Sequence, residues 1–441
     1  MMILLDAAWR ALGGEPGLLG TIERSGPAAT LPSRLDVTGM AMACAGAAGV
    51  AAAELERARG GALPRVLLDS RAVAVAFAGE RHLRIDGMPQ NSFGPLSRFW
   101  KAADGWVRTH GNYRHHRRRL FKSLGVESLN NPVPALESII RDTRAEEIEE
   151  TVFAAGGVAV AARTAEQWDA HPQGAAVAGR PLVTSIPTGR GGRQREAAPA
   201  AFPMDGVRVL DLTRVIAGPV GTRTLAYFGA EVLRIDSPAH AEFPVYHVVT
   251  GSGKRSTFLD FNDSVDRSRL RELLRDTDVV VLGYRPGALD RYGLAPEALV
   301  DEYPGLVVAS LSAWGGEGPW ARRRGFDSLV QAASGIAFVE GRPGVLPVQA
   351  LDHGTGYLLA AAVMRALTEG GGCRIELSLA RTAAWLLAHP GDGTATDFDP
   401  APYLDEVGGV RYALPAVRFE GGPRTWRRPA SIWGSDEPRW P

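Results

Sequence analysis

The sequence has 441 residues, enough for two or three domains of ordinary size, and 45% of them are hydrophobic, which excludes a globally disordered chain. Its 49 Lys and Arg residues balance 49 Asp and Glu residues, so no net charge draws the protein to nucleic acid or another polyanion. Its two cysteines, Cys44 and Cys373, cannot form a disulfide framework, and we expect a cytoplasmic protein.

The longest apolar stretch, residues 37–53, consists mainly of Ala, Gly and Met and lies between Asp36 and Glu54. It is too short and too weakly hydrophobic for a membrane span. We therefore predict a buried helix and no membrane partner.

Residues 85–186 alternate short strands with helices and predict a smaller α+β domain. The basic run Arg114–Arg119 in this part could contact nucleic acid, but its spacing favours the solvent-facing side of a helix. The buried side would be formed by Leu120, Phe121 and Leu124. Strands are predicted at residues 105–109 and 157–161, and helices at 114–124, 135–140 and 145–155.

Residues 187–203 are rich in Gly, Arg, Pro and Ala and predict a solvated linker. Beyond them, aliphatic strands alternate with amphipathic helices, which predicts a parallel sheet covered on both faces. We assign residues 204–385 to a doubly wound, Rossmann-like α/β domain. The tail, residues 386–441, has no role that the sequence indicates. Strands are predicted at residues 206–213, 230–236, 278–282 and 305–311, and helices at 222–228, 266–276 and 296–302.

An internal repeat joins the two ends of the chain. Residues 31–71 contain a short apolar segment, an Ala-rich helix and a strand, and residues 346–379 contain the same elements in the same order. Asp36 and Asp352 occupy equivalent places. A chance likeness between two Ala-rich helices is the alternative.

Two segments resemble nucleotide-binding motifs only in outline. The turn 217–221 opens a helix and the next strand ends in Asp236, as in a dinucleotide-binding unit, but the glycine spacing differs and Pro219 removes an amide donor. A sheet without a cofactor is the alternative. The segment 251–255 lacks the spacing of a phosphate loop, so its Lys254 and Arg255 either bind a phosphate as point charges or are solvated.

Asp352 is the strongest remaining candidate for chemistry, since the histidines lack metal-site spacing and there is no serine nucleophile motif. It follows a strand-like segment and precedes Gly354, Gly356 and a helix. A carboxylate there would lie at the sheet edge where α/β proteins bind ligands. The alternative is an aspartate that only caps the helix.

Several blocks resemble the family III CoA-transferases, the formyl-CoA and carnitine/bile-acid type. The Asp352–Gly356 block is similar to the one that carries the family's nucleophilic aspartate. The other blocks, in the family's order, are Asp205–Pro219, Phe228–Asp236, Lys254–Asp260, Asp278–Gly287 and Gly325–Gly335.

The order of the remaining parts departs from this family. Residues 99–186 resemble the small domain that normally follows the aspartate block, so the chain resembles a permuted or partially duplicated member. Residues 1–84 would be a degraded copy of the aspartate region, and the shorter loop at Asp36 argues against that residue as nucleophile. The family's glycine-rich loop ahead of the small domain is reduced to Gly94-Pro95.

The resemblance implies a CoA-transferase in which Asp352 attacks an acyl-CoA, forming an aspartyl anhydride and then an aspartyl-CoA thioester. Amides near Gly354 and Gly356 would stabilise the oxyanion. The substrates would be an acyl-CoA and a small carboxylate, with no tightly bound cofactor and no metal. Arg291 is the expected phosphate partner. The positions that match the family's CoA contacts are Arg214, Ile216, Ala217, Gly283, Tyr284, Arg291 and Arg324.

Three alternatives stay open. One is an acyl-CoA racemase or isomerase, although that branch has a histidine where this chain has Phe326. The others are a nicotinamide oxidoreductase and a non-catalytic remnant of the family. Because family members form interlocked dimers, the resemblance implies a homodimer or a pseudo-dimeric monomer.

Overall fold

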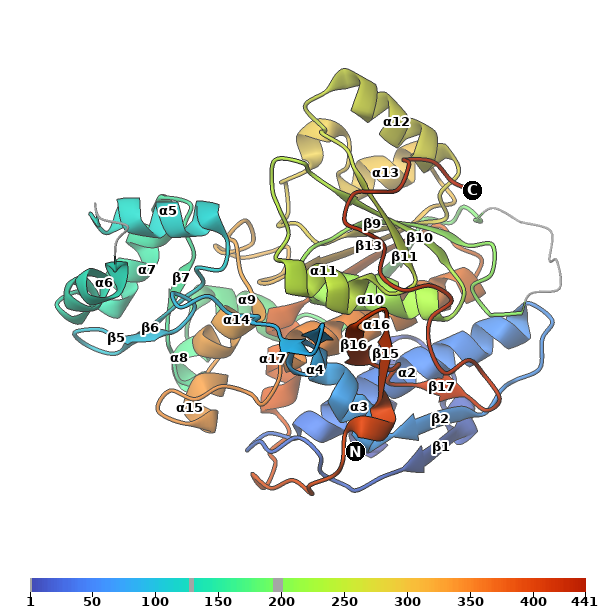
Figure 1. The fold of residues 1–441 in the computed structure, drawn as a ribbon, viewed down its shortest axis with the longest axis horizontal. Coiled ribbons are helices and arrows are strands. Elements are labelled where there is room, and N and C mark those ends of the chain that lie inside the picture. The colour runs from blue at the N-terminus through green and yellow to red at the C-terminus, as the bar shows by residue number, and fades with distance from the viewer. Residues whose placement is uncertain (1, 127–130, 193–200) are drawn as a thin grey trace.

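The computed structural model describes residues 2–126, 131–192 and 201–441. They form a large body around an extended β-sheet, and a smaller domain projects from one side of it (Figure 1). The termini both belong to the large body.

The main sheet has seven strands among the described residues, in the order β11-β10-β9-β12-β13-β14-β8. All neighbours are parallel except β8, which is antiparallel to β14. The four strands predicted between residues 206 and 311 are present, and β11 is an additional one. Because the strand order reverses between β9 and β12, their carboxyl ends open a crevice. The strands are β8 (Thr184–Pro187), β9 (Arg208–Leu212), β10 (Glu231–Asp236), β11 (Lys254–Phe258), β12 (Val279–Leu282), β13 (Val307–Ser312) and β14 (Cys373–Ser378).

Helices cover both faces of this sheet. Side chains alternate along each strand, so Leu210 packs in the core beneath α12 and α13, whereas Val209 packs in the core shared with α10 and α16. Figure 1 shows α12 and α13 on one side of the strands and α10, α11 and α16 on the other. The helices are α10 (Ala217–Tyr227), α11 (Pro244–Gly251), α12 (Ser264–Arg275), α13 (Pro296–Glu302), α14 (Asp327–Ala333), α15 (Ile336–Glu340), α16 (Ala350–Thr368), α17 (Leu379–Leu387) and the short η2 (Asp290–Tyr292).

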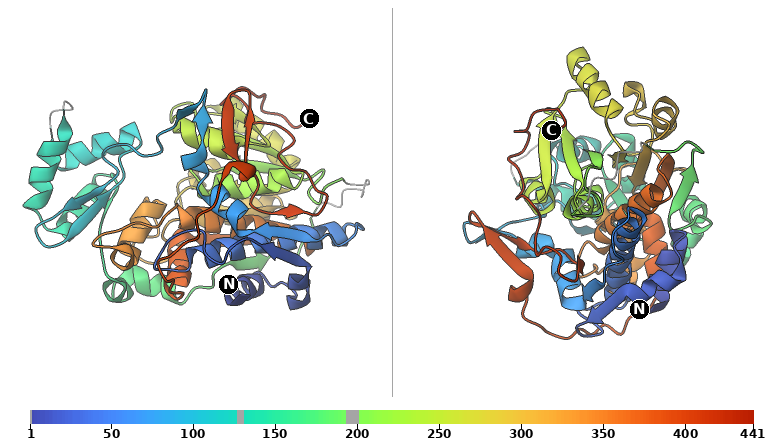
Figure 2. Two further views of the ribbon diagram at one scale, coloured as in Figure 1. Left: turned by 60° about the horizontal axis from the view of Figure 1, so that its bottom comes forward. Right: turned by 90° about the vertical axis from the view of Figure 1, so that its right-hand side faces the viewer.

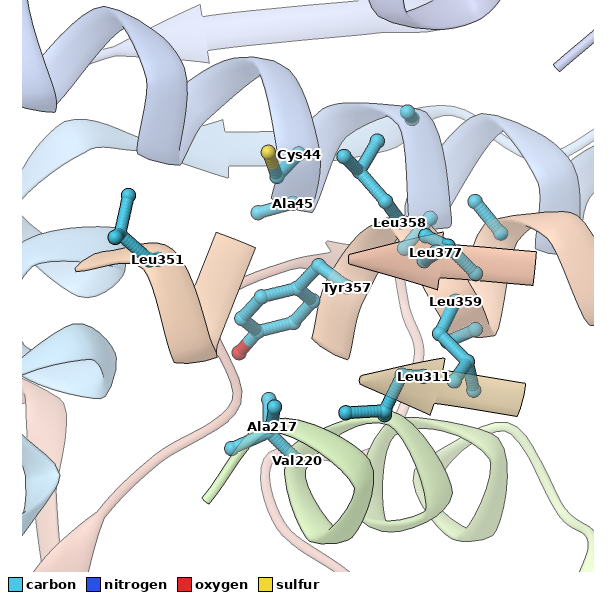
Figure 3. Close-up of a cluster of buried hydrophobic side chains, with 14 of the residues drawn as sticks. Cys44, Ala45, Ala217, Val220, Leu311, Leu351, Tyr357, Leu358, Leu359 and Leu377 are labelled. Carbon is cyan, nitrogen blue, oxygen red and sulfur yellow. The ribbon is translucent and has the colours of Figure 1, made fainter. Parts of the chain in front are cut away.

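Helix α16 lies at the centre of the large body, between α10 and α2 (Val37–Ala58) (Figure 3). Residues 37–55 of α2 are all buried, which confirms the predicted buried helix. It is the one described helix long and apolar enough to cross a membrane, and its apolar window is entirely inside the protein.

The N-terminal region packs against the far side of α2. A small sheet is formed by β1, β2 and β17, with β1 and β2 parallel. Here β2 follows α2 and leads into α3, just as β14 follows α16 and leads into α17, so the elements of the two repeat copies occur in the same order. The elements are α1 (Met2–Ala11), η1 (Pro16–Thr21), β1 (Ile22–Ser25), β2 (Val66–Asp69), α3 (Ser70–Phe77) and α4 (Gly79–His82).

The small domain is built on the antiparallel sheet β5-β6-β7 and has a hydrophobic core of its own. The strands and helices predicted from 105 to 161 are present within a few residues. Residues 84–89, however, form a hairpin that pairs with the C-terminal tail rather than with this sheet. The elements are β3 (Arg84–Ile85), β4 (Met88–Pro89), β5 (Phe99–Lys101), β6 (Trp106–Thr109), α5 (Arg114–Ser123), α6 (Pro132–Arg141), α7 (Ala145–Ala154), β7 (Ala159–Ala161), α8 (Ala165–Asp169) and α9 (Pro172–Ala178).

The predicted linker and the C-terminal tail both run along the large body (Figure 2). Pro187 ends strand β8 and Thr188 N–H donates to Gly372 O at 2.8 Å, so the predicted linker begins as an edge of the sheet. Residues 193–200 of that linker lie outside the described residues. The tail crosses the main sheet, where Trp433 Nε1 donates to Asp236 Oδ2 at 2.9 Å. Its elements are η3 (Ala401–Tyr403), β15 (Leu404–Val407), β16 (Val410–Ala413) and β17 (Arg418–Phe419).

Candidate active site

A cleft of about 270 Å³ separates the small domain from the carboxyl end of the main sheet. It adjoins a second cleft of about 460 Å³, because Tyr284 and Arg285 line both. The two together form a continuous depression along the sheet edge, at the crevice between β9 and β12. The small domain contributes Tyr113, His115 and His116 to the smaller cleft.

Asp352 lies in the smaller cleft with only 6% of its surface exposed. It is the third residue of α16, whose N-cap is Gln349. The alternative interpretation of Asp352 as a helix cap is therefore wrong. Its backbone N–H donates to Asp327 Oδ2 at 2.9 Å, so the first turn of α16 is held by a carboxylate from α14.

The surroundings of Asp352 disfavour its charged form. Burial, and then the carboxylates of Asp327 and Glu80, raise its pKa well above the usual range. Burial also raises the pKa of Asp327, to about 6. Glu80 is different: burial opposes its ionisation, but His353, whose Nε2 lies 3.0 Å from Glu80 Oε1, holds the pKa of Glu80 below its normal value. Both shifts favour a protonated carboxyl group at Asp352 or Asp327.

Five of the seven expected CoA contacts line the Asp352 cleft: Arg214, Ala217, Gly283, Tyr284 and Arg324. The other two do not. Ile216, the N-cap of α10, faces a different small cavity beside Tyr246. Arg291 is exposed, lies over the ring of Tyr292 at 4.6 Å, and lines neither cleft.

Basic side chains gather where the two clefts meet. Arg119 Nη1 and Arg324 Nη1 both donate to Gly156 O, at 3.1 and 3.2 Å. Burial, together with the charges of Arg285 and Arg119, lowers the pKa of Arg324 to about 10. Like charges so close together favour an anion between them.

Three residues expected as ligand contacts have structural partners instead. Lys254 is buried, and its Nζ donates to Asp211 Oδ2 at 2.9 Å, so it is neither solvated nor free for a phosphate. Arg255 donates to carbonyl oxygens of the tail. Asp236 is buried against Arg234 at 2.7 Å and cannot hold a ribose, which removes the main support for a nicotinamide site.

The helix after Tyr113 is amphipathic as predicted, with Leu120 and Phe121 buried. The prediction that its basic run faces only solvent is wrong at two positions, since His115 and His116 both line the cleft and His116 is 4% exposed. Helical periodicity could not find this contact, because it depends on Phe326, more than two hundred residues further along the chain.

The sequence also assigned no role to Asp327 or Glu80, although Asp327 lies in one of the family blocks. Both act through burial beside Asp352, which no local pattern shows. The prediction that amides near Gly354 and Gly356 stabilise the oxyanion is also wrong. Both glycines lie inside α16, beyond the first turn where backbone amides are free. Among the described residues, no three His, Cys, Asp or Glu side chains gather in a way that could hold a metal ion.

Residues 204–403 match the sequence model of CoA-transferase family III. This match confirms the resemblance to the family that the blocks of this region show.

Curated relatives carry related names. The chain is 34% identical over 184 residues to the probable fatty acyl-CoA transferase Rv3272 of Mycobacterium tuberculosis, covering 38% of this chain and 47% of that protein. It is 37% identical over 152 residues to the acetyl-CoA:oxalate CoA-transferase of Acetobacter aceti, covering 32% of this chain and 39% of that protein. The crystal structure of Rv3272 superposes with a TM-score of 0.40 at 33% identity, covering 43% of this chain and 58% of that one. The chain spans about half the length of the curated relatives it matches.

Proposed function

We propose that the protein is a CoA-transferase that moves CoA from an acyl-CoA donor to a carboxylate acceptor. The carboxylate of Asp352 attacks the thioester carbon, the C–S bond breaks, and CoA thiolate leaves an aspartyl anhydride behind. The thiolate then attacks the aspartyl carbonyl, releasing the donor's carboxylate and forming an aspartyl-CoA thioester. An acceptor carboxylate repeats the two steps in reverse and restores Asp352.

The observation that carries this proposal is the placement of Asp352. Its carboxyl group lies in a cleft enclosed by both domains and is almost fully shielded from solvent. An anhydride formed there would be protected from water, which is a requirement for transfer rather than hydrolysis. In the part of the chain that the structure describes, no other Asp or Glu lines this cleft.

The basic side chains support CoA as the ligand. With the thioester at Asp352, the rest of CoA would extend along the sheet edge into the larger cleft, and its phosphates would meet Arg285 and Arg324.

We also interpret the sheet as doubly wound and the chain as permuted or partially duplicated, with residues 1–84 as the degraded copy.

The test is to assay a panel of acyl-CoA donors with carboxylate acceptors, using wild type and Asp352→Asn. The variant should lose transfer, because an amide cannot form the anhydride, while CoA binding persists. Incubation of wild type with acyl-CoA and hydroxylamine should convert Asp352 to a hydroxamate that peptide mass spectrometry detects.

Asp36→Asn is the matched control. Asp36 is the N-cap of α2, and its Oδ1 accepts from Gly39 N–H at 2.7 Å, a contact that Asn keeps. Its activity should equal that of wild type. Transfer that survives Asp352→Asn, or hydroxamate on Asp36, contradicts the assignment. A wild type that transfers nothing across the panel supports the non-catalytic remnant.

One observation favours a second function, acyl-CoA racemisation. Although Phe326 replaces the histidine of the racemase branch, the ring of His110 stacks on Phe326 at 3.7 Å and that of His116 lies 5.7 Å from it. The imidazole of His116 thus reaches this part of the cleft from the small domain. Exchange of an α-proton of acyl-CoA in D₂O, without any acceptor, would identify a racemase.

A further inference from the structure

The amides nearest to Asp352 are already engaged. Asp352 N–H donates to Asp327 Oδ2 at 2.9 Å, and Asp327 also accepts from the Leu351 backbone. Ala350 N–H donates to Val348 O at 2.8 Å, and His353 N–H donates to Gln349 O at 3.0 Å. These bonds leave none of the four amides at residues 350–353 for an oxyanion that forms at Asp352. The donor has to come from another wall of the cleft.

The small domain supplies a cluster of aromatic rings on that wall. His116 lies edge-on to Phe326, with His115 at 4.0 Å and Tyr113 at 5.6 Å between ring centroids. Phe326 directly precedes Asp327, the residue that binds the Asp352 amide. Phe326 thus connects these rings with the segment that holds the Asp352 backbone.

His116 is buried, yet its imidazole has no hydrogen-bond partner among the described residues. Its Nδ1 is shielded from solvent and unpaired. Leaving a buried polar group unpaired costs about 1–3 kcal/mol, so such groups usually have a partner that the protein chain does not itself provide. Because His116 also lines the cleft, a ligand bound there is the candidate partner for its imidazole.

The surroundings of His116 favour its neutral form. Burial, helped by the neighbouring His115 and His110, lowers the pKa of His116 to about 2, and burial lowers that of His115 to about 4. A neutral imidazole has one N–H donor and one acceptor. Its weak basicity makes it a poor proton acceptor but a good donor to a carbonyl oxygen, as in triosephosphate isomerase, where a neutral histidine polarises the substrate.

We propose that His116 is a catalytic residue that donates an N–H hydrogen bond to the acyl carbonyl oxygen of the bound thioester and stabilises the oxyanion formed when Asp352 attacks. The proton stays on the ring throughout, so no proton transfer is needed. This inference rests on the proposed function, because it requires a thioester at Asp352. It also explains how transfer proceeds without the helix amides.

The experiment measures binding of two unreactive ligands, S-acetonyl-CoA, which has a ketone near the position of the thioester carbonyl, and S-propyl-CoA, which lacks it. Wild type should bind the ketone about tenfold more tightly, a hydrogen bond's contribution. His116→Phe should remove this preference and leave the Kd of S-propyl-CoA unchanged. His116→Asn, which keeps a donor, should retain part of it. His82→Phe, the same change outside the cleft, is the control.

Infrared spectroscopy of ¹³C=O-labelled S-acetonyl-CoA gives a second measure, since a donated hydrogen bond lowers the carbonyl frequency. The band should move to higher frequency in His116→Phe and not in His82→Phe. In the transfer assay, His116→Phe should lower kcat about a hundredfold and raise KM for acyl-CoA by up to about tenfold.

Equal weakening of both ligands in His116→Phe would overturn the inference, because it indicates a general structural role. Unchanged binding and band position would overturn it too. If wild type prefers the ketone but transfers no CoA, the proposed function fails while the His116 contact stands. If wild type transfers CoA and His116→Phe matches it, the inference alone fails.

Discussion

Asp352 and Asp327 are buried carboxyl groups joined through the Asp352 amide, and we expect them to titrate as a pair. As the proposed nucleophile, Asp352 must be ionised to attack, whereas burial and the Asp327 charge favour its protonated form. The activity of the free enzyme should therefore rise with pH through a range well above that of an ordinary aspartate, whose pKa is about 3.9.

Asp327→Asn tests this coupling. The amide removes the negative charge that raises the pKa of Asp352, and its oxygen can still accept from the Asp352 N–H. The acid limb of kcat/KM against pH should move to lower pH by about one unit or more, the size of effect that a nearby like charge produces. A limb that stays in place would mean that Asp352 does not control it, and Asp36→Asn serves as the control profile.

The same raised pKa predicts a stability change in Asp352→Asn. Between the unfolded pKa, about 3.9, and the higher folded pKa, the folded state holds a proton that the unfolded state has lost. The free energy of unfolding of wild type thus falls as pH rises through that window, by about 1.4 kcal/mol for each pKa unit. The variant has no such proton, so its Tm should exceed that of wild type at neutral pH and converge with it in acid. A lower Tm at neutral pH would contradict this.

At the scale of elements, α16 owes its central position to glycines. A Cβ on Gly356 would lie 2.4 Å from Ala217 O, so α10 and α16 touch backbone to backbone there. A Cβ on Gly354, half a turn away, would meet Cys44 Sγ and Met40 Cε at 3.4 Å, an ordinary contact. A side chain therefore fits at position 354 but would clash with the α10 backbone at position 356.

Gly356→Ala should lower the free energy of unfolding by about 1–3 kcal/mol, because the methyl group forces the helices apart. It should also weaken CoA binding, since Ala217 lines the cleft. Gly354→Ala, the matched control, should be neutral or stabilise by up to about 1 kcal/mol, the helix propensity difference. Urea unfolding measures both, and equal effects would contradict the close-approach explanation.

How far the sequence predicted these elements depended on where their partners lie. The strands β9, β10, β12 and β13 are aliphatic runs between turns, and their hydrophobicity alone marks them. Strand β11 is polar, and it is stable because Lys254 reaches Asp211 of β9 and the tail pairs with Ser256. Such tertiary contacts leave no local pattern.

The candidate site follows the same rule. The sequence predicts Asp352 because its block stands in the same order as in the family. Five of the seven residues expected to contact CoA line the same cleft as Asp352. The sequence does not indicate Asp327 or His116, because their roles come from burial and from contacts between distant segments. The prediction of Arg291 as a phosphate contact is wrong, because a match in sequence position does not show that its side chain stacks on Tyr292.

At the scale of the whole molecule, one chain provides both walls of the cleft. Tyr113 and His116 come from the small domain, and Arg214 and Asp352 from the large body. The domains are joined by buried contacts: Gln173 Nε2 donates to Trp314 O at 2.9 Å and Gln173 Oε1 accepts from Trp320 N–H at 2.6 Å. This arrangement predicts a site that is completed within one chain.

The protein should therefore act as a pseudo-dimeric monomer rather than as an interlocked homodimer. Light scattering should give the mass of one chain, 47.0 kDa. Activity per milligram should stay constant on dilution, because no step depends on association. As a further check, mixing Asp352→Asn with His116→Phe should restore no activity. Each chain forms its own cleft, so an intact residue of one variant cannot replace the altered residue of the other. A doubled mass, loss of activity on dilution, or recovery of activity in the mixture would show that two chains share the site.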